Sequence, residues 1–188
     1  PDGDVLGSEL ALARFLRSRG KQVRCLNVGI IPANYRWFLG TREVRLYAPR
    51  RDDRFIRAAD AAIAFDYASW DRLEALRAPI AAGRAVTLGI DHHPPVGARP
   101  RIDVVDRRAC ATGEMVYDLI HAMGGRITRA IAEPLYVALV TDTGSFRYSN
   151  TTRRSHLIAA HLVAAGADPY RTYREIYESS SRARLALM

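Results

Sequence analysis

The sequence predicts an α/β fold in which a mostly parallel sheet is flanked by helices and is followed by a helical second half. The first observation is that short apolar runs at residues 61–65 and 85–90 alternate with helix-like patterns, as they do in parallel sheets covered by helices. The second is that longer amphipathic patterns dominate after residue 106. Because no linker-like composition separates the two halves, we expect one domain over residues 1–188.

The first half of the chain alternates between predicted helices and strands. Apolar residues at helical spacing follow Val5 until Gly20 ends the pattern, and Ser69 suits the N-cap of a short helix. Residues 32–40 are ambiguous, the Pro-rich stretch 94–100 predicts a loop, and residues 102–105 fit an edge strand. In chain order, the predicted elements are a helix at 5–19, strands at 22–27, 44–47 and 61–65, a helix at 69–76 and a strand at 85–90.

The second half is predicted to be helical. Two of its helical patterns end at Gly124 and Gly166, where glycine can adopt the left-handed conformation that closes a helix. Residues 128–140 are apolar enough for a mostly buried helix, in which Pro134 is tolerable only near the first turn. The predicted helices cover residues 112–123, 128–140, 154–165 and 168–178.

Acidic and imidazole side chains stand where the apolar elements end or where helices begin. Asp91-His92-His93 follows the run at 85–90, at the end of a predicted buried strand. Carboxylate and imidazole together suit a borderline to hard divalent cation, and strand ends are where α/β folds bind ligands. Each acidic position alone also fits a turn or a helix cap, but together they predict a metal site at one edge of the sheet. The other positions are Asp2 and Asp4 in the opening Pro1-Asp2-Gly3-Asp4, Asp66 after residues 61–65, and Asp142 after residues 135–140.

These residues resemble the motifs of the DHH phosphoesterase superfamily, and the resemblance extends over the whole chain. Within the superfamily, residues 111–114, 142–151 and 166–169 resemble the nanoRNase and pAp phosphatase branch, a group of bifunctional oligoribonucleases. The resemblance implies that residues 1–188 form a DHH catalytic domain. The first motif is matched by Pro1-Asp2-Gly3-Asp4 with Gly7-Ser8, the second by Asp66, the third by Asp91-His92-His93 and the fourth by Asp142.

The resemblance also implies a role for each motif residue in a two-metal centre. Asp91 would orient a metal ligand from behind, a role that carboxylates commonly take. His93 would contact the scissile phosphate or assist the leaving group, so Asp91 and His93 are the predicted catalytic residues. For the metals, the implied ligands are Asp2 on the first ion, Asp4 on the second, Asp66 bridging both, and His92 and Asp142 completing the second site.

The loop after Asp142 holds the predicted substrate contacts. Arg147, Ser149 and Asn150 are polar side chains that can bind a phosphate or a sugar. A hydrogen-bonded turn that caps the helix beginning near Arg154 explains them equally well.

The implied cofactor is manganese, two ions per site, with magnesium or cobalt also compatible. Two divalent ions about 3.5–4 Å apart can hold a phosphate, activate water and neutralise the leaving oxygen. The expected activity is hydrolysis of short oligoribonucleotides, of 3′-phosphoadenosine 5′-phosphate, or of both, so the expected partner is short RNA or a nucleotide, and a homodimer is compatible. The alternatives left open are a cyclic-dinucleotide phosphodiesterase, a RecJ-type single-strand exonuclease, a manganese-dependent pyrophosphatase and a non-catalytic nucleotide-binding module.

The chain departs from the family pattern in two ways. The family's first motif normally carries a histidine shortly before its Pro-Asp-Gly-Asp, whereas this sequence starts at Pro1. The family also has a smaller C-terminal domain of the DHHA1 type, and no such segment follows Met188. We therefore expect a fragment that lacks one metal ligand and much of its substrate clamp.

Composition narrows the class of protein without identifying a substrate. The net charge is +8, carried almost entirely by arginine, which permits binding to phosphate-rich partners. Cys25 and Cys110 are too few for a disulfide framework, so both are expected to be small buried hydrophobic residues. No stretch approaches the roughly 20 apolar residues that span a bilayer, and a cytoplasmic setting is expected.

Overall fold

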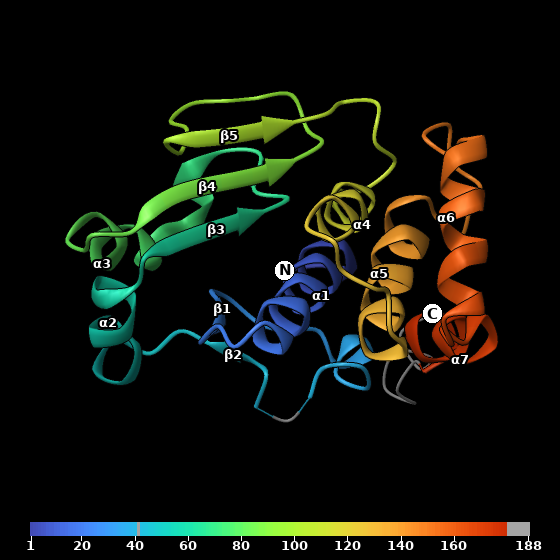
Figure 1. The fold of residues 1–188 in the computed structure, drawn as a ribbon, viewed down its shortest axis with the longest axis horizontal. Coiled ribbons are helices and arrows are strands. Elements are labelled where there is room, and N and C mark those ends of the chain that lie inside the picture. Colours follow the sequence, from blue (N-terminus) through green and yellow to red (C-terminus); the bar gives the residue numbers. More distant parts are fainter. Residues whose placement is uncertain (41, 180–188) are drawn as a thin grey trace, which may run out of the picture.

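The computed structural model describes residues 1–40 and 42–179, and it confirms the predicted α/β fold. In this part of the chain the strands form two parallel sheets (Figure 1). One sheet pairs β1 (Cys25–Asn27) with β2 (Val44–Leu46). The other has the order β3 (Ala61–Phe65), β4 (Val86–Asp91) and β5 (Ile102–Val105).

The register of the second sheet brings the predicted site residues to one edge. Phe65, the last residue of β3, lies opposite Ile90, so Asp66 and Asp91 both stand at the carboxyl end of their strands. On the other side of β4, Asp91 lies opposite Val105. Parallel strands end at the same edge of a sheet, and for this reason residues 25 positions apart in the sequence become neighbours.

Helices supply the rest of the fold, and the second half is helical, as predicted. A helix at 49–58 was not predicted, because its sequence is mostly charged and has only Phe55 and Ile56 as large apolar residues. The short helix predicted at 69–76 is a 3₁₀ helix whose N-cap is Ser69. The helical elements are α1 (Gly3–Ser18), η1 (Ala33–Tyr35), α2 (Pro49–Ala58), η2 (Trp70–Leu76), α3 (Arg77–Ala81), α4 (Thr112–Ala122), α5 (Arg129–Asp142), α6 (Arg153–Ala164), α7 (Pro169–Tyr173) and the π-helical turn η3 (Arg174–Glu178).

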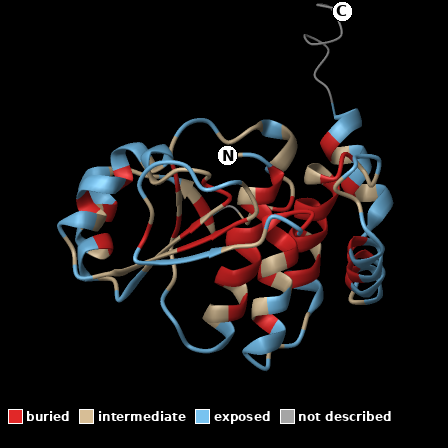
Figure 2. Ribbon diagram, turned by 90° about the horizontal axis from the view of Figure 1, so that it is seen from above, coloured by how far each residue is buried: buried red, intermediate tan, exposed pale blue. Residues whose placement is uncertain are grey.

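The hydrophobic core is centred on the contact between α1 and α5. Leu6 and Leu10 of α1 and Leu135 and Leu139 of α5 are completely buried. Figure 2 shows the buried residues concentrated in the central helices of the molecule. The two helices approach very closely at Gly7, where an added Cβ would lie 2.3 Å from the carbonyl oxygen of Pro134. This close packing fixes the start of α1 against the end of α5, both of which carry predicted site residues.

Pro134 lies inside α5 and not near its first turn, so the expectation for this proline was wrong. A proline inside a helix leaves the carbonyl four residues earlier without its usual N–H donor. That carbonyl belongs to Ala130, and it accepts a hydrogen bond from Nη1 of Arg14 at 2.6 Å. A side chain from α1 therefore replaces the lost backbone bond.

Two further sequence expectations concern the cysteines and membrane-spanning helices. Cys25 and Cys110 are free and buried, as predicted. Among the described residues, every helix is too short or too polar to cross a bilayer.

Candidate metal centre

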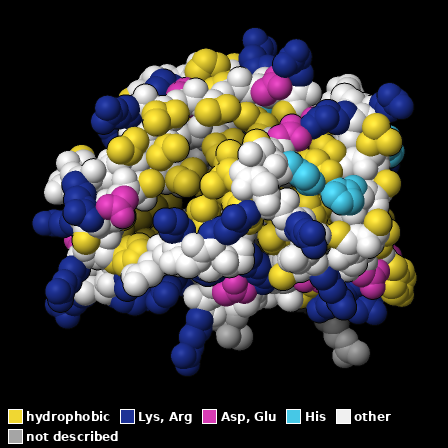
Figure 3. Space-filling model, in the orientation of Figure 1, with side chains coloured by type: hydrophobic (Ala, Val, Ile, Leu, Met, Phe, Trp, Pro, Cys, Tyr) yellow, Lys and Arg dark blue, Asp and Glu magenta, His cyan; other side chains and the backbone are white. Residues whose placement is uncertain are grey.

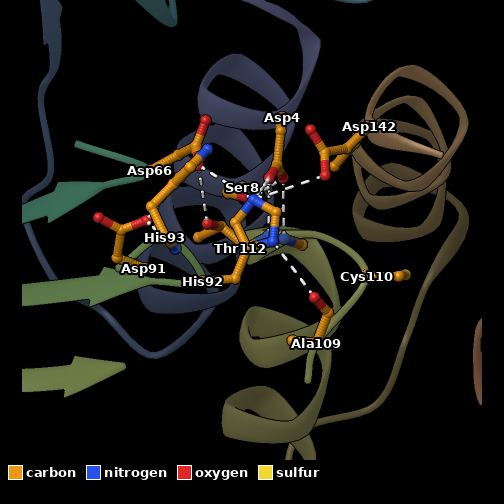
Figure 4. A network of polar contacts seen from close by, with 12 residues as sticks. Asp4, Ser8, Asp66, Asp91, His92, His93, Ala109, Cys110, Thr112 and Asp142 are labelled. Atoms are coloured by element: carbon orange, nitrogen blue, oxygen red, sulfur yellow. Dashed lines mark hydrogen bonds and ion pairs between the residues drawn. The ribbon is translucent and has the colours of Figure 1, made fainter. Parts of the chain in front are cut away.

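Side chains from α1, β3, β4 and α5 converge at the carboxyl edge of the second sheet (Figure 4). The centre of the group is Nε2 of His92. It lies 3.4 Å from Oδ1 of Asp66, 3.5 Å from Oδ2 of Asp142 and 3.9 Å from Oδ2 of Asp4. Three carboxylates that are distant in the sequence thus surround one imidazole nitrogen.

The ring of His92 is held in the orientation of a metal ligand. Its Nδ1 lies 3.2 Å from the carbonyl oxygen of Ala109. A carbonyl can only accept a hydrogen bond, so Nδ1 donates to it and Nε2 is the ring nitrogen that faces the carboxylates. Nε2 is buried and has no hydrogen-bond partner among the described residues. A buried polar atom without a partner needs an explanation, and a bound cation supplies one.

Asp4 is fixed by the first turn of α4. Its carboxylate is 1% exposed and accepts the backbone N–H groups of Thr112 at 2.6 Å and Gly113 at 2.9 Å. Ser8, one turn along α1, donates its hydroxyl to the same carboxylate at 3.1 Å. Ala111 at the N-cap of α4 provides no side-chain cap, so Asp4 satisfies free N–H groups of that helix from α1.

Burial and the neighbouring negative charges raise the pKa of two carboxyl groups in this cluster, those of Asp4 and Asp142. Burial raises the pKa of Asp4 well above its usual value, and the charges of Asp66 and Asp142 raise it further, against the two N–H groups of α4. Burial also raises the pKa of Asp142; the imidazole of His92 opposes this shift and Asp66 adds to it. Added positive charge would relieve this repulsion.

The pKa of His92 reflects the same field. Burial lowers it, but the carboxylates of Asp66, Asp142 and Asp4 outweigh burial and raise the pKa to about 9. Positive charge is thus stabilised at Nε2 itself. A divalent cation is the ligand that a cluster of several carboxylates and an imidazole best accommodates.

Asp66 reaches the cluster through an unusual backbone conformation. Its φ is 48°, in the left-handed region that non-glycine residues rarely adopt. Its N–H still donates to the carbonyl of Ile90 at 3.0 Å, so the chain turns only after pairing with β4. The hydroxyl of Thr112 lies 3.4 Å from Oδ1 of Asp66. Strain held in place by surrounding bonds is common at functional sites.

His93 and Asp91 form a second pair beside the cluster. Oδ1 of Asp91 accepts from the backbone N–H and from Nδ1 of His93, both at 3.0 Å, while Oδ2 accepts from the N–H of Ala68 at 2.7 Å. Asp91 is completely buried, whereas the His93 side chain is 42% exposed. Nδ1 of His93 also lies 3.0 Å from Oδ1 of Asp66. Asp91 therefore orients His93 between the buried carboxylates and the surface.

The convergent residues can hold cations in two overlapping groups. Asp66, His92 and His93 each offer one ligand atom within 4.8 Å of the others, and Asp4, His92 and Asp142 do the same. His92 belongs to both groups, and the carboxylate and imidazole ligands that surround it fit a divalent metal. The assignment of individual ligands to two ions stays a prediction.

Asp2 stands apart from these groups. It is exposed and serves as the N-cap of α1, where Oδ1 accepts the N–H groups of Asp4 and Val5 at 3.1 Å. The helix that it caps begins at Gly3 and not at Val5, the predicted start. Neither group of potential metal ligands among the described residues includes Asp2. The role of Asp2 on a first metal ion stays a prediction.

The predicted substrate contacts lie near Asp142 but differ in what they do. Arg147 and Ser149 are exposed, and Nε of Arg147 donates to the carbonyl of Gly144 at 3.0 Å. Nδ2 of Asn150 donates to the backbone carbonyl of Asp142 at 3.0 Å and lies 3.3 Å from its Oδ2. Asn150 thus positions the Asp142 carboxylate, and contact of these three residues with a substrate stays a prediction.

Sequence reasoning gave no role to several residues that hold the site. Thr112 and Gly113 donate to Asp4, Ser8 supports the same carboxylate, and the Ala109 carbonyl orients His92. The sequence did contain a signal, since Thr112-Gly113 opens a helix directly after an apolar stretch. Its meaning depends on α1 lying against that helix, which no local pattern reveals.

Comparison with known proteins places this arrangement in a family. Residues 1–139 match the DHH family, N-terminal domain, a region that includes Asp4, Asp66 and the Asp91-His92-His93 triplet. The chain belongs to the DHH family. The predicted resemblance to the DHH superfamily and the predicted fold class are therefore confirmed.

Curated relatives match this chain over about half of their own length. The bifunctional oligoribonuclease and PAP phosphatase NrnA of Thermus thermophilus is 31% identical over 169 residues, which cover 88% of this chain and 48% of that protein. The protein of the same name from Bacillus subtilis is 27% identical over 182 residues, or 95% of this chain and 55% of that protein. The chain thus spans about half the length of these curated relatives.

A solved structure agrees closely with the fold of this DHH-family chain. The crystal structure of an exopolyphosphatase-related protein from Bacteroides fragilis matches it with a TM-score of 0.93 and 32% sequence identity. The match covers 100% of this chain and 56% of that chain.

Proposed function

We propose that this chain is the catalytic half of a metal-dependent phosphoesterase that hydrolyses short oligoribonucleotides, 3′-phosphoadenosine 5′-phosphate, or both. The observation that carries the proposal is the buried Nε2 of His92, which lies among three carboxylates and has no hydrogen-bond partner within residues 1–40 and 42–179. Membership of the DHH family supports phosphoesterase chemistry, and the names of the Thermus and Bacillus relatives support this choice of substrate.

The proposed cofactor is a pair of manganese ions, with magnesium or cobalt as substitutes. When bound, divalent ions would hold the phosphate, activate a water and neutralise the leaving oxygen. Asp66 lies 3.4 Å from His92 Nε2 and 3.0 Å from His93 Nδ1, a central position that suits a bridging ligand. Asp4, Asp142 and His92 would hold the second ion.

His93 is proposed to act on the substrate. Asp91 and Asp66 hold its Nδ1, so Nε2 is the ring nitrogen left to face a phosphate. From there it can contact the scissile phosphate or donate a proton to the leaving oxygen. Asp91 acts through His93 as a positioning residue, because both of its oxygens are occupied by protein donors.

The test is a substrate panel assayed with manganese on the natural full-length protein and on its Asp66→Asn variant. We expect short oligoribonucleotides or 3′-phosphoadenosine 5′-phosphate to be hydrolysed, and turnover to disappear in the variant, because an amide has no charge to hold two cations. Asp118→Asn is the matched control. Asp118 is an exposed residue of α4 that forms a salt bridge with Arg154 and lies outside the cluster.

The panel also separates the alternatives. Preferential hydrolysis of a cyclic dinucleotide, pyrophosphate or long single-stranded DNA would replace the proposed substrate while keeping the metal centre. Near-normal activity of Asp66→Asn would contradict the two-metal assignment. Binding of nucleotide without turnover of any substrate would favour a non-catalytic module.

A further inference from the structure

A groove runs between the two sheets, and none of the residues that line it belongs to the metal centre. It has a volume of about 740 Å³ and is lined on one side by β1 and on the other by β3. Leu12 and Leu16 of α1 close one face, and Leu73 and Leu76 of η2 line the opposite wall. Figure 1 shows β1 and β3 facing each other across this gap, and Figure 3 shows hydrophobic side chains in a hollow of the same region.

The backbone of β3 has free hydrogen-bonding groups on the groove side. The N–H of Val86 donates to the carbonyl of Asp60, and the N–H of Asp66 donates to the carbonyl of Ile90. Groups alternate in direction along a strand, so residues 60, 62, 64 and 66 face β4, and Ala61, Ile63 and Phe65 face the groove. In the described part of the chain β3 pairs with β4 alone, so the backbone groups of these three residues have no partner strand.

The facing edge of β1 is also free. The N–H of Tyr47 donates to the carbonyl of Asn27, which places Asn27 and Cys25 toward β2 and Leu26 toward the groove. Leu26, Ile63 and Phe65 are only half-buried, although they stand in the middle of the molecule. Inner strands of parallel sheets are normally buried on both faces and paired on both edges.

Both strands run in the same direction. Val23, before β1, accepts a hydrogen bond from Arg17 near the end of α1, and Asn27 donates to Glu9 nearer its start. β1 therefore runs toward the start of α1. β3 also ends there, because Asp66 lies in the cluster with Asp4. A strand placed between them and running parallel to both would end beside Pro1.

We propose that this groove is the seat of one further β-strand, formed by the residues that lead into Pro1. The strand would hydrogen bond to Leu26 on one side and to Ile63 and Phe65 on the other, and so join the two sheets into one parallel sheet. With α1 and β1 it would complete a strand–helix–strand unit, whose parallel strands are usually neighbours. Because most of the residues that line the groove are apolar, the strand should be a short apolar run of about five residues.

Amide hydrogen exchange tests the proposal without reference to activity. The 188-residue chain is compared with a longer natural polypeptide that carries the residues before Pro1. We expect the amides of Leu26 and Ile63 to exchange at least about 100-fold more slowly in the longer form. The amide of Ala64, which faces β4, is the internal control and should be protected in both forms.

Two results would overturn the proposal. One is equal exchange of Leu26 and Ile63 in the two forms. The other is protection in the 188-residue chain that increases with protein concentration, because a second copy would then occupy the groove.

A pair of variants gives a second readout. Ile63→Pro removes the N–H that would face the new strand, and Ile63→Ala controls for the lost side chain. Proline is tolerated on an edge strand but not in a paired strand interior. We expect the difference in denaturation midpoint between the two variants to be larger in the longer form; an equal difference in both forms would contradict the proposed strand.

Discussion

At the scale of single residues, His92 is the best-defined part of the site. The Ala109 carbonyl fixes which ring nitrogen is protonated, and the three carboxylates around Nε2 create a demand for positive charge. His93, its neighbour in the sequence, is bonded to Asp91 and is far more exposed. Two adjacent histidines are thus held by different partners, in line with the different tasks proposed for them.

The first prediction separates these tasks. His93→Ala should keep bound metal but lose about 10²–10⁴ in turnover, the usual contribution of a positioned acid–base group. His92→Ala is the contrasting variant and should lose metal as well as turnover. Metal content and kcat measured on the same preparations check both. Loss of metal from His93→Ala would make His93 a ligand in the group with Asp66 and His92.

The second prediction concerns Glu9, a buried residue of α1 that contacts Asn27 of β1. Burial raises its pKa to about 8, and the hydrogen bond from Asn27 and nearby positive charges only partly oppose this. The folded state therefore holds a proton that the unfolded chain has released between pH 4.5 and about 8. Stability gained from this proton is fully present below pH 4.5 and is lost as the pH rises toward 8.

Glu9→Gln should remove this pH dependence, because a glutamine can keep the bond from Asn27 without a charge. We expect the variant to unfold at higher urea concentration than the natural chain at pH 8, and at the same concentration near pH 4.5. The pH dependence that the substitution should remove is a slope in the free energy of unfolding of at most about 1.4 kcal/mol per pH unit. Glu178→Gln, at an exposed position, is the control and should leave the pH profile unchanged.

At the scale of elements, α1 links the core to the site. It carries Asp4 at its start and contacts α5 through Gly7. Its Arg14 donates to the carbonyl in α5 that Pro134 leaves without a backbone donor. Glycine inside a helix normally weakens it by about 1 kcal/mol relative to alanine. Here the lost stability is outweighed by close packing, since neither the Pro134 carbonyl nor the Ala138 backbone can move away from a Cβ.

Gly7→Ala should therefore destabilise the protein, contrary to helix propensity. We expect a loss of about 1–3 kcal/mol from overpacking, measured as a lower urea midpoint. Because α1 would shift, manganese affinity should fall with it. Ser18→Ala, in the exposed last turn of the same helix, is the control and should change stability by less than about 0.5 kcal/mol. A more stable Gly7→Ala variant would show that the two helices can separate at this point.

At the scale of the whole molecule, the site exists only because distant segments meet. Asp4, Asp66, His92 and Asp142 come from elements spread over nearly 140 residues of sequence, and they surround one point. Any ligand that holds them together also ties α1, the second sheet and α5 to one another. Metal binding and folding stability should be linked for this reason.

Calorimetric titration of the 188-residue chain with manganese tests this arrangement. We expect one tighter site, built by Asp4, Asp66, His92 and Asp142, and a weaker first site, because Asp2 is exposed and already caps α1. Saturation of the tight site at about 100 times its Kd should raise the free energy of unfolding by about 2.7 kcal/mol. Asp142→Asn should weaken this site and Asp118→Asn should not. Two equally tight sites would contradict the ligand assignment.

The sequence by itself determined the fold class, the central strands and the family. Residues 61–65 and 85–90 are apolar runs too short for helices, and their identity as strands follows from local composition and length. The acidic and imidazole residues at their ends follow from the rule that ligands bind at strand ends. These features depend on neighbours in the chain, so the pattern alone reveals them.

The tertiary structure alone decided how the site is held. The helix at 49–58 has few apolar residues, Pro134 depends on a donor from Arg14, and Asp4 depends on the N–H groups of Thr112 and Gly113. The hydrogen bonds of Arg14 and of Asp4 join residues more than 100 positions apart in the sequence. Their partners are fixed by the packing of α1 against α5 and α4, which is set by the shape of the whole core and not by any local pattern.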